Sequence, residues 1–178
     1  VNRFFGTTWT AENCRYPVRK TQENEDDRTR PANIIITCTD NTRSRLELWR
    51  FLKKYREASV NNERAVYYWM DFGNAQTTGQ VFIGTVRNKI RQPASKEFIP
   101  VPGMNVITEE VNYSTIEEKD SGPSCSLAEA LERQDLYINS ILAQVGCDIL
   151  WRMFKEGRTL YRGAYINLDT LRVNPIPV

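Results

Sequence analysis

The chain has 178 residues, of which 40% are hydrophobic and 26% charged, so it is long enough to bury the core of one globular domain. Its formal net charge is only +2, with both signs interspersed, which argues against a nucleic-acid footprint or a membrane-surface patch. It contains no apolar run long enough to span a bilayer, and the absence of histidine excludes an imidazole base or ligand within these residues.

The cysteines and the first residues predict a reducing compartment. Cys14, Cys38, Cys125 and Cys147 are scattered without Cys-x-x-Cys spacing, so we expect neither a disulfide framework nor bound zinc. The chain begins Val1-Asn2-Arg3, which is neither a signal peptide nor a start methionine. We therefore expect a cytoplasmic chain that is cut from a longer protein.

The first half of the chain reads as a strand, a helix and two further strands. A charged stretch over residues 20–30 predicts a loop, and the apolar run that follows predicts a strand over 33–39. Helical spacing of Leu48 and Leu52 predicts an amphipathic helix from Thr42 to about 59. A buried strand is then expected over 65–71, a turn at Gly73-Asn74, and an antiparallel strand over 79–86.

The second half predicts a crossover, a long helix and a hairpin. Residues 87–122 are rich in proline and polar side chains and read as a mobile crossover loop. A capping box at Ser126 predicts the start of a helix, and the apolar pattern continues as a core helix, with or without a break near residues 134–139, that ends at Gly157. Strands over 160–166 and 170–173 close the chain as an antiparallel hairpin. The predicted class is α/β, with a Rossmann-like mixed sheet and flanking helices.

Asp40 is the first candidate site residue. It follows the run Ile34-Ile35-Ile36 and Thr37-Cys38-Thr39 and precedes a helix, at the carboxyl end of a predicted buried strand. Ligands of open α/β sheets bind at such ends, where Asp40 would hold a metal ion or make polar phosphate contacts. The alternative is that Asp40 only caps the following helix.

The order of these features resembles the ThiF/MoeB/HesA superfamily of enzymes that activate ubiquitin-like and sulfur-carrier proteins. The shared features are Cys-Thr-Asp-Asn with Arg45 on the next helix, a strand beginning Gly79-Gln80-Val81, and the run Pro123-Ser124-Cys125-Ser126. This last run is most similar to the ThiF family of the PRTRC plasmid-associated system. The resemblance covers nearly the whole chain and lies in the combination of motifs.

The resemblance implies ATP-dependent adenylation of the C-terminal carboxylate of a ubiquitin-like or sulfur-carrier protein. It implies that Asp40 positions Mg²⁺ and phosphate, that Asn41 supports the nucleotide, and that Arg45 is catalytic. The alternatives are that Asn41 completes the helix cap and that Arg45 is a surface arginine paired with Glu47 or Asp40. ATP, Mg²⁺ and a homodimer are implied as well, with no role for nucleic acid or membrane.

Cys125 is the third implied catalytic residue. Some members of the superfamily use a thiol at this position for a covalent link to sulfur or a thioester, and a helix N-terminus favours the thiolate. The alternative is a small buried residue at a helix start. Cys14, Cys38 and Cys147 match no motif and are expected to be packing or bystander thiols.

The chain also departs from the superfamily pattern. It contains no Gly-x-Gly-x-x-Gly loop, no paired Cys-x-x-Cys zinc ligands and no arginine motif upstream, and Arg3 is assigned no catalytic role. We therefore expect the chain to supply the C-terminal part of an adenylating domain and to be inactive alone. The rival hypotheses are a noncatalytic scaffold that binds a partner, and a dehydrogenase or methyltransferase.

Overall fold

The computed structural model describes residues 2–11, 32–39, 41–56, 65–88, 90–113 and 135–178. The chain divides into two units, Val1–Arg30 and Pro31–Val178. In the first unit, the described residues form the single helical turn α1 (Asn2–Phe5). The side-chain oxygen of Asn2 accepts hydrogen bonds from the Thr7 hydroxyl at 2.6 Å and from the Trp9 amide at 3.0 Å.

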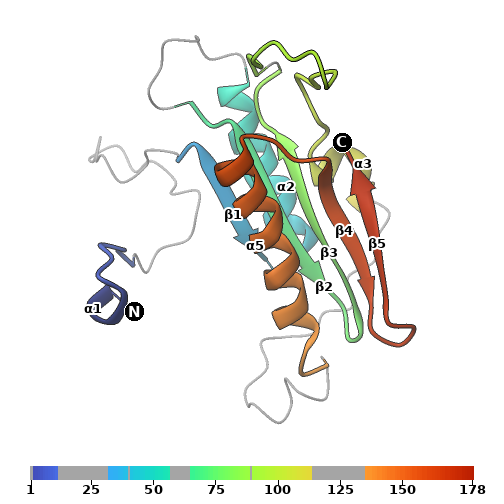
Figure 1. Cartoon of the computed structure of the whole chain (residues 1–178). Helices are drawn as coiled ribbons and strands as arrows, with labels where there is room; N and C mark the ends of the chain where they lie inside the picture. Colours follow the sequence, from blue (N-terminus) through green and yellow to red (C-terminus); the bar gives the residue numbers. More distant parts are fainter. Residues whose placement is uncertain (1, 12–31, 40, 57–64, 89, 114–134) are drawn as a thin grey trace. The chain divides into compact units, whose positions relative to one another are not determined.

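The second unit is built on a five-stranded mixed sheet whose order follows the chain (Figure 1). The first two strands are parallel, and every later neighbour is antiparallel. This arrangement confirms the predicted α/β class, the mixed sheet and the C-terminal hairpin. The strands are β1 (Ile34–Cys38), β2 (Tyr68–Asn74), β3 (Thr78–Thr85), β4 (Tyr161–Asn167) and β5 (Arg172–Pro177).

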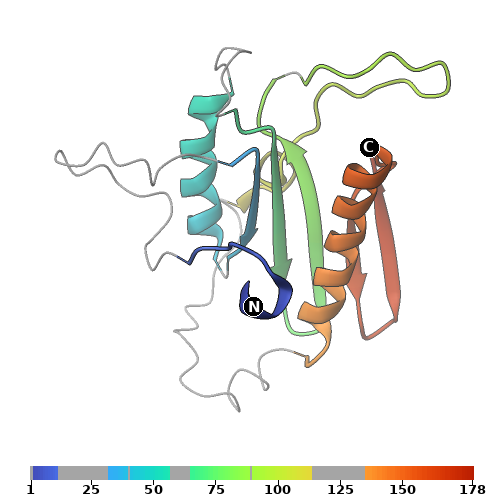
Figure 2. The ribbon, with the colours of Figure 1, turned by 60° about the vertical axis from the view of Figure 1, so that its left-hand side comes forward.

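One face of the sheet is covered by α2 (Thr42–Leu52), which continues as the 3₁₀ helix η2 (Lys53–Tyr55) (Figure 2). Leu48, Trp49 and Leu52 of α2 are buried in one apolar cluster with Trp69 of β2 and Phe82 of β3. The rings of Trp49 and Trp69 stack with their centroids 6.1 Å apart. The amphipathic pattern that predicts the helix therefore also fixes which face meets the sheet.

The opposite face is covered by α5 (Ile138–Glu156), as Figures 1 and 2 show from two sides. Its Ile149 packs with Met70, Val81 and Ile83 of the sheet. The predicted end of this helix is confirmed, because Gly157 adopts the left-handed conformation of a C-cap with φ 68°. Within the described part of the chain, no helix combines the length and the apolarity that crossing a bilayer requires.

A short helix that the sequence did not predict, α3 (Ile107–Glu110), lies in the long connection between β3 and α5. Val106 and Ile107 are buried in the cluster on the α2 side of the sheet. Arg162 links β4 to α3, because its guanidinium donates a hydrogen bond to the Glu110 carboxylate at 3.0 Å. The connection over residues 87–122 thus contains an anchored element, and its residues 114–122 lie outside the described part.

The boundaries of β2 differ from the prediction, which placed the strand at 65–71 and a turn at Gly73-Asn74. Both turn residues belong to the strand instead, since Gly73 pairs with Gln80 and Asn74 pairs with Gly79 of β3. The hairpin turns after Asn74, where the Ala75 amide donates to the Thr78 carbonyl at 2.8 Å. The tertiary pairing therefore overrides the local turn preference of Gly and Asn.

The last strand also extends further than predicted. The sequence pattern predicts this strand over 170–173, whereas β5 begins at Arg172 and continues to Pro177. Proline is tolerated on an edge strand, where its missing N–H faces away from the ladder. The predicted helix from Thr42 to about 59 ends earlier as an α-helix, at Leu52, and residues 57–59 lie outside the described part.

We predict that Gly146→Ala destabilises the protein. A Cβ atom at Gly146 of α5 would lie 2.3 Å from Cζ of Phe72 and 3.2 Å from Cγ2 of Val81, so the ring must move. Overpacking of this kind costs about 1–3 kcal/mol, more than the ~1 kcal/mol that alanine gains over glycine in a helix.

Urea denaturation followed by circular dichroism measures this change. Gln144→Ala, two residues earlier on the exposed side of α5, is the matched control and is expected to leave the midpoint nearly unchanged. A Gly146→Ala protein more stable than the parent would show that α5 does not pack this closely on the sheet.

Candidate functional site

The candidate site lies at one edge of the sheet, where the carboxyl ends of β1 and β2 meet (Figure 1). Because the two strands are parallel, α2 begins at this edge and crosses back over the sheet. Asn41 is the N-cap of α2, and its side-chain oxygen accepts a hydrogen bond from the Ser44 amide at 2.8 Å. Such a cap stabilises a helix by about 1 kcal/mol.

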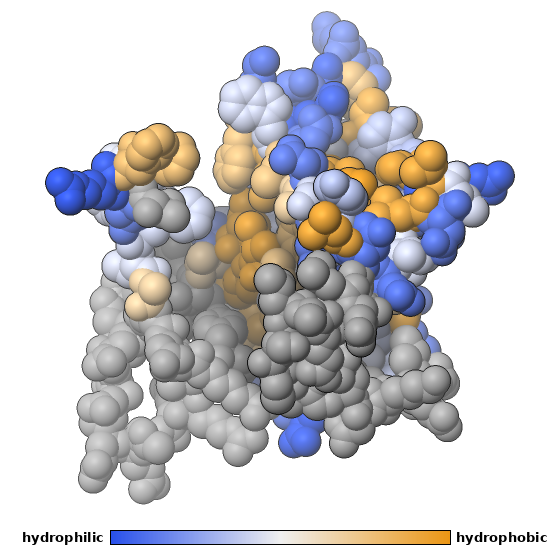
Figure 3. All heavy atoms as spheres, turned by 90° about the horizontal axis from the view of Figure 1, so that it is seen from below, coloured by the Kyte–Doolittle hydropathy of each residue, from blue (hydrophilic) through white to orange (hydrophobic). Residues whose placement is uncertain are grey.

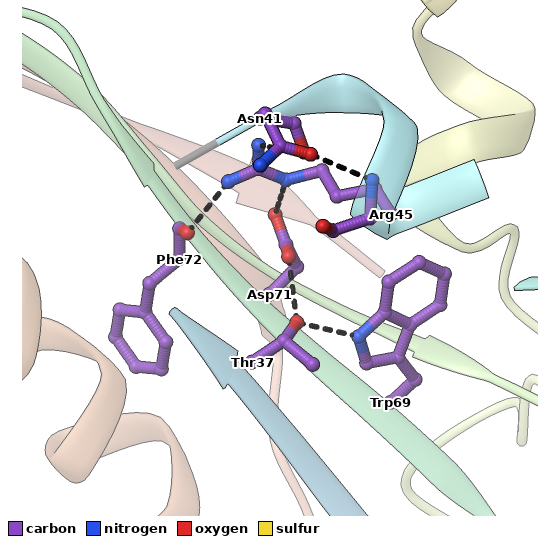
Figure 4. Close-up of polar contacts among 7 residues, drawn as sticks. Thr37, Asn41, Arg45, Trp69, Asp71 and Phe72 are labelled. Carbon is purple, nitrogen blue, oxygen red and sulfur yellow. Dashed lines mark hydrogen bonds and ion pairs between the residues drawn. The ribbon is translucent and has the colours of Figure 1, made fainter. Parts of the chain in front are cut away.

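A buried ion pair joins α2 to β2 at this edge (Figure 4). Nε of Arg45 donates to Oδ2 of Asp71 at 2.8 Å, and the two side chains are only 7% and 1% exposed. Alternation along β2 places Asp71 and Trp69 on the face that α2 covers. The pair therefore lies between the helix and the sheet rather than on the surface.

The second oxygen of Asp71 is satisfied by the neighbouring strand. The Thr37 hydroxyl of β1 donates to Oδ1 of Asp71 at 2.6 Å and accepts from Nε1 of Trp69 at 2.8 Å (Figure 4). Thr37 and Asp71 are direct neighbours in the parallel register. Every side-chain oxygen of Asp71 thus has a partner, as a buried carboxylate requires.

The remaining nitrogens of Arg45 reach main-chain carbonyls at the ends of two elements. Nη2 donates to the Phe72 carbonyl of β2 at 2.9 Å, and Nη1 makes a longer contact of 3.5 Å with the Asn41 carbonyl. Figure 4 shows both contacts beside the Asp71 pair. The guanidinium therefore links the start of α2 to the end of β2.

The pKa of Asp71 reflects these opposing effects. Burial raises the pKa of this carboxyl above its ordinary value, while the Arg45 guanidinium and the hydrogen bonds from Thr37 and Arg45 act in the opposite direction. Burial is the largest of the causes. The Arg45 guanidinium therefore stabilises the carboxylate form, and its removal would raise the pKa of Asp71 further.

The ring of Tyr113 lies over the Arg45 guanidinium. The Arg45 carbon Cζ is 5.8 Å from the centre of the Tyr113 ring. Burial is the main cause that raises the pKa of the Tyr113 phenol to about 12. Its hydroxyl is buried and has no hydrogen-bond partner among the described residues. Tyr113 thereby shields the ion pair from water.

Two further features belong to this edge. The Thr39 hydroxyl, at the end of β1, is buried and has no partner among the residues that the structure describes. Gly73 leaves room for the network, because a Cβ there would lie 2.4 Å from Nε2 of Gln80 and 2.9 Å from Nη2 of Arg45. Any larger residue at position 73 would displace the guanidinium.

Of the predicted site residues, Arg45 and Asn41 lie in the described part of the chain. The alternative reading of Arg45 as a surface arginine paired with Glu47 or Asp40 is wrong, since its side chain is buried against Asp71. It is Arg43 that pairs with Glu47, at 3.1 Å on the exposed side of α2. Asp40 and Cys125 lie outside the described residues.

The cysteines of the described part are not buried in the core. Cys38 and Cys147 are both exposed, so neither fills a core position, while Cys14 lies outside the described residues. The sulfur of Cys38 is partly covered, and this partial burial raises the pKa of its thiol. Nearby Asp71 raises the pKa further while Arg45 lowers it, and the raised pKa disfavours the reactive thiolate. Among the described residues, no three His, Cys, Asp or Glu side chains gather as a metal site.

Sequence reasoning missed Asp71. It was placed at the end of a buried apolar strand without a partner, and a lone acid in such a strand is itself the signal, because a buried charge requires an opposite charge nearby. The order of helices and strands along the chain does not show which positively charged side chain pairs with Asp71. Only the packing of α2 on the sheet brings Arg45 to it.

Comparison with known proteins adds no family assignment: no family model matches the chain, and no curated protein matches it.

The face of the molecule seen from below carries hydrophobic residues among the hydrophilic ones (Figure 3). Leu136 and Tyr137 just before α5, and Leu171 in the turn between β4 and β5, are 64%, 63% and 86% exposed. Scattered exposed apolar residues of this kind are ordinary on a protein surface.

We predict that Asp71→Ala destabilises the protein by about 3–5 kcal/mol, because it leaves the Arg45 guanidinium buried without its anion. The double variant Asp71→Leu/Arg45→Met removes both charges and is expected to lose far less, since apolar replacements of a buried pair are often nearly neutral. Chemical denaturation of the parent, Asp71→Leu, Arg45→Met and the double variant, which together form one double-mutant cycle, measures the coupling.

The control is the exposed pair of Asp148 and Arg152 on α5, whose N–O distance is also 2.8 Å. Asp148→Ala is expected to change stability little, because solvent screens an exposed pair. Equal effects of Asp71→Ala and Asp148→Ala would contradict the buried character of the Arg45–Asp71 pair.

Proposed function

We propose that the chain is the C-terminal part of a ThiF-type adenylating domain, which activates the C-terminal carboxylate of a ubiquitin-like or sulfur-carrier protein with ATP. The observation that carries the proposal is the edge formed by the ends of β1 and β2 and the start of α2. Asp40 and Asn41 fall at this edge in the sequence, and nucleotides bind α/β sheets at such edges.

The order of elements also supports the proposal. A strand that leads into Asp40, a crossover helix with Arg45, and a parallel strand are followed by an antiparallel strand containing Gly79-Gln80-Val81. A long helix and a terminal hairpin come last. The resemblance to the ThiF family implies the same order of elements. A shared order supports a shared fold, whereas a function must be argued from the residues of a site.

The start of α2 suits a phosphate group. Its first turn contains no acidic residue, so the positive end of the helix dipole there attracts an anion. The Thr39 hydroxyl, directly after β1, is a buried polar group that lacks a partner among the described residues. Mg²⁺ binds through one or two carboxylates together with substrate phosphates, and Asp40 would supply the carboxylate.

In the proposed reaction, an oxygen of the carrier's C-terminal carboxylate forms a bond to the α-phosphorus of ATP. The bond from that phosphorus to the bridging oxygen breaks, and pyrophosphate leaves with the electron pair. The protein's contribution is to neutralise charge and align the groups. Arg45 is fully engaged with Asp71 and two carbonyls, so in this proposal it acts on the shape of the edge and not on the phosphates.

We further propose a homodimer that acts in the cytoplasm without nucleic acid or membrane, and that needs a Gly-rich phosphate-binding part beyond these 178 residues. The rival hypothesis is a noncatalytic scaffold. It predicts no nucleotide turnover even by a longer polypeptide that joins this chain to the Gly-rich part, and the tests below therefore use that longer polypeptide.

We predict that Asp40→Ala abolishes ATP–pyrophosphate exchange in a polypeptide that joins this chain to the Gly-rich part. The carboxylate that would anchor magnesium is removed, and loss of charge stabilisation of this kind costs a factor of about 100 or more. Asn41→Ser, which retains a capping side chain, is expected to exchange at a reduced but measurable rate. If Asp40→Ala exchanges pyrophosphate at the parental rate, Asp40 does not anchor magnesium and only caps the helix.

A thiol-transfer step would make Cys125 the most reactive cysteine. A thiolate favoured by a helix N-terminus reacts faster with iodoacetamide near neutral pH than an ordinary thiol does. The reference is Cys147, which is exposed on α5. Mass spectrometry of the four cysteines across pH measures the rates, and a Cys125 that is no faster than Cys147 removes the transfer step while leaving adenylation in place.

A further inference from the structure

The described residues of this edge include one acid that the proposed reaction does not use directly. Asp71 is 1% exposed and lies one strand away from the start of α2, so it cannot meet a ligand from solvent. Its two oxygens are occupied by Arg45 at 2.8 Å and Thr37 at 2.6 Å. Its influence on a bound molecule must therefore pass through those partners.

The path from Asp71 to the start of α2 is short. Asp71 fixes Arg45 through Nε, and the same guanidinium then contacts the carbonyls of Phe72 at 2.9 Å and Asn41 at 3.5 Å. Asn41 in turn caps the Ser44 amide. One buried carboxylate thus sets the place of the helix end at which the phosphates are proposed to bind.

A purely structural role for Asp71 would add little to the stability of the protein. A buried ion pair contributes little net stability compared with apolar residues of similar volume, because the desolvation of both charges offsets their attraction. The surrounding cluster of Leu48, Trp49 and Trp69 already joins α2 to the sheet. What the pair adds is orientation, since the planar guanidinium holds its partners in a fixed fork.

We propose that Asp71 is a positioning residue for nucleotide binding, which acts through Arg45 on the Asn41 cap of α2. This inference rests on the proposed adenylating function. Partners that orient the groups around a metal typically change metal affinity or activity by about 10- to 100-fold when they are removed. Loss of Asp71 should therefore weaken Mg·ATP binding without removing any group that touches the nucleotide.

The test compares stability and nucleotide binding in the same variants of the polypeptide that includes the Gly-rich part. Asp71→Leu/Arg45→Met replaces the pair by apolar side chains and is expected to fold with a near-parental midpoint of denaturation. Its Kd for Mg·ATP, measured by calorimetry, should rise about 10-fold or more. Asp148→Ala/Arg152→Ala, at the exposed pair on α5, should change neither quantity.

The outcomes separate the inference from the function. If the parent binds Mg·ATP, Asp40→Ala abolishes binding and the folded double variant binds like the parent, Asp71 is only structural and the inference is overturned. If the parent does not bind Mg·ATP, the adenylating function fails and the inference fails with it. Should the double variant not fold, Asp71→Asn, which keeps the shape of the side chain, takes its place. A folded Asp71→Asn protein that binds Mg·ATP with the parental Kd overturns the inference.

Discussion

Arg45 and Asp71 place opposite charges between a helix and a sheet, in a position that water hardly reaches. Removing two such charges from water costs several kcal/mol per ion, and their attraction offsets this cost only when the geometry is good and the remaining polar atoms are satisfied. Here Thr37 completes the carboxylate, and two carbonyls complete the guanidinium. The pair therefore tolerates only one arrangement of β1, β2 and the start of α2.

The apolar layers on the two faces of the sheet make this edge rigid. Trp69 and Phe82 pack under α2, whereas Met70 and Val81 pack under α5, so β2 and β3 are held from both sides. Close contacts such as Gly146 against Phe72 leave these strands little freedom to shift. An edge that is supported in this way suits a site whose chemistry depends on alignment.

Much of the fold could be predicted from local signals. The apolar run of Ile34–Cys38 and the amphipathic repeat of α2 specify their own structures, and Gly157 ends α5 as expected. The errors occurred where long-range pairing decides, as at Gly73 within β2 and at Pro175 within β5. The position of the site at the edge where β1 and β2 end stays a prediction, and the sequence does not single out Asp71, because its partner Arg45 lies 26 residues away along the chain.

The central claim is that a nucleotide binds with its phosphates at the start of α2. Nuclear magnetic resonance of the polypeptide with the Gly-rich part, titrated with Mg²⁺ and a non-hydrolysable ATP analogue, tests this most directly. The account predicts that the largest shifts affect the amides of Thr39, Asn41 and the first turn of α2, while the C-terminal turn of α5 is unaffected. Shifts confined to another part of the sheet, or none at saturating analogue, would contradict it.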